Sequence, residues 1–156
     1  MSFTTNIPQG LSKTDKYKQL LSDATHLVDE QVDIIANMAN LSRLIFDYFS
    51  HHWVGFYRVN DDQLVLGPFQ GPVACTTIKF GQGVCGKAWQ EGETQLVADV
   101  HQFPGHIACS ALSNSEIVVP CFKNGELFAV LDIDSEHFNQ FDSTDRKYLE
   151  QLVSLL

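Results

Sequence analysis

The stretch EIVVPCFKNGELFAVLDID, residues 116–134, carries the clearest local pattern in the chain. Two runs rich in apolar residues flank the pair Asn124-Gly125. This pair favours a two-residue type I′ turn, because both positions of that turn need positive φ. The stretch therefore predicts a β-hairpin with strands at 116–122 and 126–134.

Helical patterns lie at both ends of the chain, outside this hairpin. We expect helices at 13–27, 31–49 and 143–156, the last capped by Asp142 or Ser143. Extended and short helical segments fill the middle: strands at 51–59, 63–69, 74–80 and 94–100, a short helix at 84–92 and a loop at 101–114. Terminal helices around hairpin strands predict an α+β fold with a mainly antiparallel sheet.

Length and charge narrow the class of protein. The chain has 156 residues, which predicts a flexible segment at 1–11 and a single domain at 12–156. It carries 19 acidic and 10 basic residues, a formal charge of -9. Nucleic acids and acidic membrane surfaces bind clustered Lys and Arg, so this charge argues against both partners. The N-terminus lacks the pattern of a signal peptide and no apolar run could span a bilayer, so we expect a cytoplasmic protein.

The chain has four cysteines: Cys75, Cys85, Cys109 and Cys121. In a reducing cytosol they are candidates for metal ligands, redox-active groups or core fillers rather than structural disulfides. No two of them have the spacing of a zinc-binding pair, so no metal site is predicted. Cys121 lies in an apolar strand and is expected to be a buried filler. Cys109 lies in a loop of small and polar residues, where an exposed and reactive thiol is possible.

The segment GQGVCG, residues 81–86, matches the fingerprint of a dinucleotide-binding loop. A Rossmann unit, however, needs parallel strands and a full crossover helix, whereas a short helix and a hairpin follow here. No acid lies about 20 residues beyond the loop, since Asp99 comes too early. We therefore interpret the segment as a tight turn into a short helix. Glycines that admit the backbone to some other ligand are the alternative.

Acidic and aromatic side chains share faces of the predicted strands. Asp132 and Asp134 are two residues apart on a strand, so both point to one face. Trp53 and Tyr57 likewise share a face of the first strand. A solvated strand end and ordinary core packing would explain the two pairs separately. Together they would form a pocket for a small cation, and aromatic rings also accept methyl and sulfur groups.

Glu116 raises a geometric problem for such a pocket. With a two-residue turn at positions 124 and 125, the residue numbers of each cross-strand pair add up to 249. Glu116 would therefore pair with Ile133. In that register Glu116 points away from the face of Asp132 and Asp134. A bulge between Glu116 and the turn, or a loop position for Glu116, would unite the three acids. Pro120 is the expected bulge site, because it lacks a donor for the ladder.

Five short motifs resemble a known family, the free methionine-(R)-sulfoxide reductases, which are built on a GAF domain. The motifs are GPVAC (71–75), GVCG (83–86), HIAC (106–109), SNSEI (113–117) and VLDIDS (130–135). The resemblance covers roughly residues 15–156, and the spacing of its three cysteines is the most specific part. It implies a single GAF-like domain, with a central antiparallel sheet, helices packed on one face and a ligand pocket on the other.

The family reduces free methionine sulfoxide, not sulfoxide within proteins, and only the R epimer. By resemblance, Cys109 is the catalytic cysteine, Cys75 resolves it through a disulfide, and Cys85 is a third cysteine that can join the exchange. The substrate-site carboxylates and the aromatic wall are also implied: Glu116, Asp132, Asp134, Trp53 and Tyr57. Thioredoxin would restore the thiols as an external reductant, with no bound cofactor, and a homodimer is possible. Ser110 departs from the pattern, since many members carry an acid there.

The chemistry explains why a thiol and acids would share a site. A thiol can attack the sulfur of a sulfoxide, but oxide and hydroxide leave poorly without a proton. An exposed carboxyl, with a pKa near about 4, is mostly ionised at neutral pH. Burial and neighbouring like charges raise that pKa, so one acid of three could stay protonated as a donor, of which Glu116 and Asp134 are the candidates. The others could hold the ammonium group of the substrate.

Two other classes of protein fit parts of the pattern. A non-catalytic GAF-type sensor would bind a small ligand in the same pocket and use its cysteines only to register oxidation. A sensor usually carries an output domain, and no residues follow the last predicted helix, which favours a self-contained enzyme. A zinc-stabilised interaction module would require stoichiometric metal.

Overall fold

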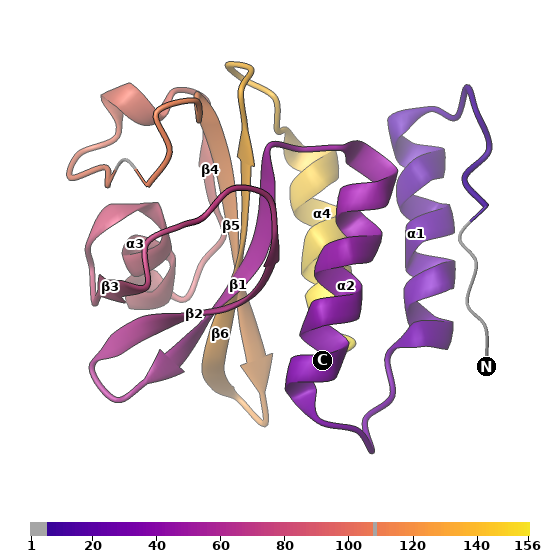
Figure 1. Cartoon of the computed structure of the whole chain (residues 1–156), viewed down its shortest axis with the longest axis horizontal. Helices are drawn as coiled ribbons and strands as arrows, with labels where there is room; N and C mark the ends of the chain where they lie inside the picture. The colour runs from indigo at the N-terminus through magenta and orange to yellow at the C-terminus, as the bar shows by residue number, and fades with distance from the viewer. Residues whose placement is uncertain (1–5, 108) are drawn as a thin grey trace.

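The computed structural model describes residues 6–107 and 109–156 (Figure 1). Its elements, in chain order, are α1 Lys13–Leu27, α2 Ile34–Phe49, β1 Trp53–Asn60, β2 Gln63–Gln70, β3 Thr77–Lys79, α3 Gly83–Glu91, β4 Gln95–Val97, the 3-10 turn η1 Val100–Gln102, β5 Ser115–Lys123, β6 Glu126–Ser135 and α4 Ser143–Val153. The strands form one antiparallel sheet in the order β3-β2-β1-β6-β5-β4. The α+β prediction with an antiparallel sheet is confirmed.

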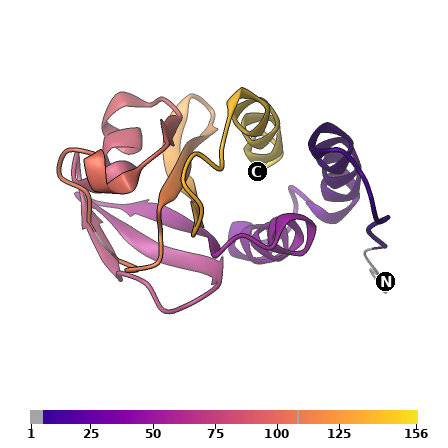
Figure 2. The same cartoon turned by 90° about the horizontal axis from the view of Figure 1, so that it is seen from above.

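Three helices cover one face of the sheet. Figure 2 shows α2 and α4 directly against it, with α1 packed outside them. Their apolar faces and alternate residues of β1, β5 and β6 form the larger core. The short helix α3 lies on the opposite face, over a smaller apolar cluster. The expected arrangement of helices on one face therefore holds for the long helices, while α3 covers the other.

Side-chain caps explain where the long helices begin. The Asp33 side chain accepts a hydrogen bond from the backbone N–H of Ile35, so the second helix begins at Ile34 rather than at residue 31. Asp142, not Ser143, caps α4 with a reciprocal capping box. These caps move the predicted boundaries by a few residues and leave the number of helices unchanged.

The hairpin contains the bulge that the acidic pocket requires, but in the partner strand. Asn124 and Gly125 both have positive φ, 53° and 79°, as a type I′ turn needs. Lys123 pairs with Glu126, whereas Cys121 pairs with Ala129, so an extra residue lies in β6 near Phe128. From the Cys121–Ala129 pair onwards, away from the turn, the residue numbers of each pair add up to 250 instead of 249.

The expected bulge at Pro120 is therefore wrong. Pro120 pairs regularly with Val130, in a part of β5 beyond the last pair with β4, Gln95–Val118. There β5 has an open edge, which tolerates a residue without a backbone donor. The extra residue also turns Phe128 towards the core under the helices. As a result, Glu116 pairs with Asp134 and shares its face of the sheet.

Residues 1–5 of the predicted flexible segment lie outside the described residues. Ile7, within the same segment, packs against the core under the helices. The flexibility of residues 1–11 stays a prediction. In the described part of the chain, no helix combines the length and apolar character that crossing a bilayer requires.

Candidate active site

A pocket opens on the face of the sheet opposite α1, α2 and α4. Its floor is formed by β1, β5 and β6, and its walls by α3 and two loops, one following β2 and one preceding β5. The lining includes every residue that the sequence singled out for the site except Cys75: Trp53, Tyr57, Cys85, Cys109, Glu116, Asp132 and Asp134. In the described residues no lysine or arginine lines it.

Strand register places the acids beside the aromatic wall. Trp53 pairs with Asp134 across β1 and β6, and Asp134 pairs with Glu116 across β6 and β5. These three residues form one row across the sheet. Gly55 pairs with Asp132 in the next row. The side chains of Glu116 and Asp132 are buried, with 6% of each residue exposed.

Burial and mutual repulsion keep protons on this cluster. Burial, followed by the charges of Asp132 and Asp134, raises the pKa of Glu116 well above its ordinary value. Burial and the charge of Asp132 raise the pKa of Asp134, although Ser113 and His52 lower it in part. Burial raises the pKa of Asp132 to about 6, against the lowering effect of contacts with Glu116 and Cys85. Asp132 is therefore the acid that ionises first, whereas burial, both neighbouring acids and a hydrogen bond with Asp132 all raise the pKa of Glu116.

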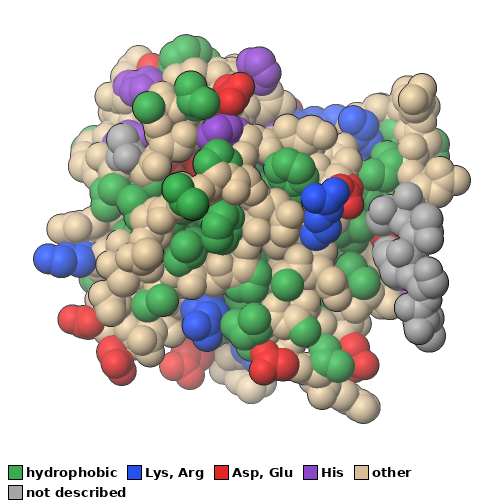
Figure 3. Space-filling view, viewed as in Figure 1, with side chains coloured by type: hydrophobic (Ala, Val, Ile, Leu, Met, Phe, Trp, Pro, Cys, Tyr) green, Lys and Arg blue, Asp and Glu red, His purple; other side chains and the backbone are tan. Residues whose placement is uncertain are grey.

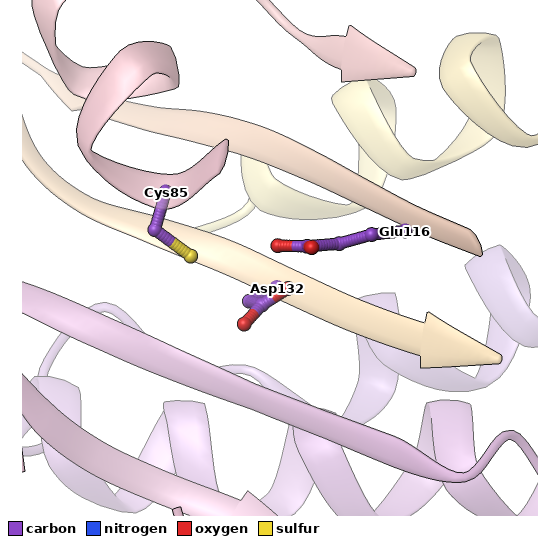
Figure 4. Close-up of side chains that lie close together, drawn as sticks. All are labelled: Cys85, Glu116 and Asp132. Atoms are coloured by element: carbon purple, nitrogen blue, oxygen red, sulfur yellow. The ribbon is translucent and has the colours of Figure 1, made fainter. Parts of the chain in front are cut away.

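Cys85 is the thiol nearest to the acids. It lies in α3, and its side chain points from the helix towards Glu116 and Asp132 (Figure 4). One ligand-type atom from each of the three residues lies within 4.8 Å of the other two. Burial, then the charges of Asp132 and Glu116, raises the pKa of the Cys85 thiol. Cys85 is therefore held as a protonated thiol on the α3 wall of the pocket, facing the acids of the floor.

Cys75 and Cys109 are joined by a disulfide, with their Cα atoms 5.5 Å apart. Both residues are half-buried and lie in the two loops that wall the pocket. Ala108, next to Cys109, lies outside the described residues. Cys121 is fully buried in the core under the helices, which confirms the prediction of a filler. The structure thus separates Cys121 from the other three cysteines, which lie in or beside the pocket.

The aromatic wall also anchors the loop that carries Cys75. The rings of Trp53 and Tyr57 lie side by side, with centroids 5.9 Å apart. The indole N–H of Trp53 donates to the carbonyl of Pro72 over 3.0 Å, and the hydroxyl of Tyr57 donates to the carbonyl of Cys75 over 2.9 Å. These bonds hold the backbone of the Cys75 loop against the sheet. The same contacts therefore position both the aromatic wall and Cys75.

A histidine that the sequence reasoning missed ties the Cys109 loop to the end of β6. His52 Nδ1 lies 3.1 Å from a carboxylate oxygen of Glu136, and its Nε2 lies 3.0 Å from the hydroxyl of Ser110. Ser110 directly follows Cys109 in the chain. Figure 3 shows several histidines gathered over this end of the molecule. No local signal marks His52, because its partners are distant in sequence.

The glycine-rich segment 81–86 forms a tight turn into α3, as predicted. A Cβ on Gly86 would lie 2.6 Å from the carbonyl oxygen of Lys79, so only glycine permits this close approach. Helix α3 has nine residues and the strands that follow are antiparallel. The segment is therefore not followed by the parallel strands and full crossover helix of a dinucleotide-binding unit. Its glycines instead let α3 pack closely at the edge of the pocket.

Comparisons with known proteins find relatives that match most of the chain. The model of the GAF domain family matches residues 28–156. GAF domain-containing protein A of Dictyostelium discoideum is 51% identical over 146 residues, covering 93% of this chain and 92% of that protein. Free methionine-R-sulfoxide reductase of Escherichia coli is 45% identical over 147 residues, covering 94% and 89%. A crystal structure of free methionine-R-sulfoxide reductase from Neisseria meningitidis, in complex with its substrate, is 48% identical with a TM-score of 0.93, covering 97% and 92%.

Proposed function

Because the chain belongs to the free methionine-R-sulfoxide reductases of the GAF-domain family, we propose that it reduces free L-methionine-(R)-sulfoxide to methionine. It is an oxidoreductase that acts through its thiols. The observation that carries the proposal is the Cys75–Cys109 disulfide beside a pocket lined by three carboxyls, of which Glu116 and Asp132 are buried. Two thiols supply the electrons, and the carboxyls supply a proton for the departing oxygen.

The proposed reaction balances in three steps. The Cys109 thiol attacks the sulfoxide sulfur and forms a sulfur–sulfur bond, while protonation lets the oxygen leave as water. That water attacks the Cys109 sulfur, breaks the sulfur–sulfur bond and returns a proton, so Cys109 becomes a sulfenic acid and methionine is released. The Cys75 thiol then attacks the sulfenic acid, forming the disulfide and releasing water. A dithiol protein of the thioredoxin kind reduces the disulfide and is itself oxidised. Cys85 is proposed as a second partner for disulfide exchange.

The three carboxyls are proposed to have different roles in the reaction. We assign proton donation to Glu116, because burial and the neighbouring acids Asp132 and Asp134 raise its pKa. Asp134, also held protonated, is the second candidate donor and lies beside Glu116 in the same row. Asp132 ionises first and is proposed to hold the ammonium group of the substrate. Trp53 and Tyr57 are proposed to contact its methyl and sulfur groups.

The experiment that tests the function compares three substrates in a thioredoxin-coupled assay. We expect turnover with the free R epimer, and none above background with the free S epimer or with R-sulfoxide inside a peptide. If reduced, folded protein turns over none of them, a ligand-binding sensor replaces the enzyme as the function. Turnover of the peptide substrate would contradict the restriction to free amino acid. A cytoplasmic setting and a homodimer stay predictions.

We predict a bell-shaped pH dependence of kcat/KM for the free R epimer. The rate rises with pH as the attacking thiol ionises, and it falls again as the donor carboxyl loses its proton. An ordinary carboxyl would be almost fully ionised above about pH 6, whereas the raised pKa of Glu116 extends its protonated range upwards. Steady-state rates between pH 5 and 10 measure this profile. A rate that climbs steadily to pH 10 would remove the proton donor from the mechanism.

We also predict that Gly55→Ala impairs substrate binding. A Cβ at this position would lie 2.5 Å from the outer edge of the Trp53 ring and 2.4 Å from the Cβ of Phe69, so the ring must move. Displacing one aromatic wall should raise KM roughly tenfold, equivalent to about 1.4 kcal/mol, and change kcat less. Steady-state kinetics and the fluorescence of the tryptophans measure both effects. An unchanged KM in a variant with altered fluorescence would remove Trp53 from the substrate site.

A further inference from the structure

We propose that Cys85, Glu116 and Asp132 form a binding site for a thiophilic divalent cation, of the Zn²⁺ or Cd²⁺ class. The three side chains come from α3, β5 and β6 and converge on one point of the pocket floor (Figure 4). Their ligand atoms all lie within 4.8 Å of one another. The proposal concerns binding by the folded chain and does not rest on the proposed function.

The donor set and its spacing suit such an ion. Zinc takes one sulfur at about 2.3 Å and carboxylate oxygens at about 2.0–2.2 Å, which places tetrahedral donors roughly 3.3–3.6 Å apart. Small rotations of side chains already within 4.8 Å reach that spacing. Binding would displace the proton of the Cys85 thiol, and the resulting thiolate selects Zn²⁺ or Cd²⁺ over Mg²⁺ and Ca²⁺, which prefer oxygen ligands alone. The fourth position would face the pocket.

An unpartnered oxygen in the cluster points independently to a ligand. Oδ1 of Asp132 is buried and has no hydrogen-bond partner among the described residues. Only 6% of Asp132 is exposed, and the residue lines the pocket. A buried polar atom without a partner costs roughly 1–3 kcal/mol, which a bound cation would offset. The pocket lining in the described residues also supplies no lysine or arginine to balance its acids.

Occupation of this site would block the reaction rather than assist it. The ion would engage Glu116, the proposed proton donor, and Asp132, the proposed partner of the substrate ammonium. It would therefore compete with the substrate. The site stays available when Cys75 and Cys109 are joined, because that disulfide leaves Cys85 free.

The test uses the disulfide-bonded protein, in which Cys85 is the free thiol of the pocket and Cys121 is buried elsewhere. Cd²⁺ is titrated while the ultraviolet absorption band of a cadmium–thiolate bond is recorded, and Zn²⁺ binding is measured by calorimetry. We expect one equivalent of each ion to bind. Cys85→Ala should lose the band and weaken Zn²⁺ binding at least about 100-fold, whereas Cys121→Ser should keep both.

Asp132→Asn provides a second variant that keeps the thiol, so a folding defect in Cys85→Ala does not leave the question open. It should weaken the binding of both ions at least about 10-fold, because losing a direct ligand costs no less than losing an outer-shell partner. Zinc bound by the neighbouring His101 and His106, whose rings lie 6.4 Å apart, would give calorimetric heat without a thiolate band. A missing band in the unmodified protein, or an equal band in Cys85→Ala, overturns the proposal. So does undiminished Cd²⁺ affinity in Asp132→Asn.

Discussion

Replacing Cys109 with serine is expected to reduce turnover of free methionine-(R)-sulfoxide to background, a loss of at least about 10³-fold. The hydroxyl of serine is far less nucleophilic than a thiol and cannot form the sulfenic acid or the disulfide. Cys109 is joined to Cys75 and lines the pocket, whereas burial raises the pKa of Cys85, the other cysteine of the lining, and makes it a poorer nucleophile. Coupled steady-state kinetics measure the loss.

Cys121→Ser is the matched control for this substitution. Cys121 is fully buried in the core under the helices, away from the pocket. Its replacement should cost stability, because a hydroxyl replaces an apolar thiol, and should leave turnover of the folded protein within about twofold. If Cys109→Ser retains more than a few per cent of the activity, Cys85 becomes the nucleophile and the assignment is wrong.

The second large effect is expected for Glu116→Gln, with a loss in kcat of roughly 10²–10³-fold. Glutamine keeps the size and hydrogen-bonding capacity of the side chain but has no proton to give to the departing oxygen. KM should change less than kcat, since Asp132 still holds the substrate. The high-pH limb of the pH profile should also disappear, because the group that titrates there has been removed.

Glu126→Gln is the control for this variant, since Glu126 is an exposed residue of the same hairpin at the turn end. It should leave kcat and the pH profile unchanged. A Glu116→Gln enzyme that retains both a normal kcat and the high-pH limb would show that Glu116 is not the donor. Asp134→Asn would then be the next variant to measure, because burial raises the pKa of that acid too.

The hairpin and the long helices could be predicted from the sequence because their signals are local. Asn124-Gly125 marks the turn through backbone conformation alone, and caps and apolar spacing mark α1, α2 and α4. The bulge near Phe128 has no such signal. The run ELFAVLDID is apolar enough to place Phe128 on either face, and packing under the helices decides between them. A shift of one residue in the strand register then determines whether the side chain of Glu116 faces the pocket.

Part of the site could be predicted because some of its signals are local too. Alternation along a strand brought Asp132 beside Asp134, and the motifs pointed to the three cysteines. The contact between His52 and Ser110 joins residues 58 positions apart, across a loop with no regular period. The approach of Cys85 to the acids depends on how α3 packs, with Gly86 close to Lys79. Such contacts follow from tertiary packing and not from any local pattern.

A single-turnover experiment tests the central claim most directly. Fully reduced protein is mixed with excess free methionine-(R)-sulfoxide in the absence of any other reductant, and both the methionine and the protein thiols are quantified. Mass spectrometry of peptides then locates the disulfide. The account predicts one methionine per chain, the loss of two thiols and a disulfide between Cys75 and Cys109. Methionine formed without loss of thiols, or a first disulfide that excludes Cys109, would contradict it.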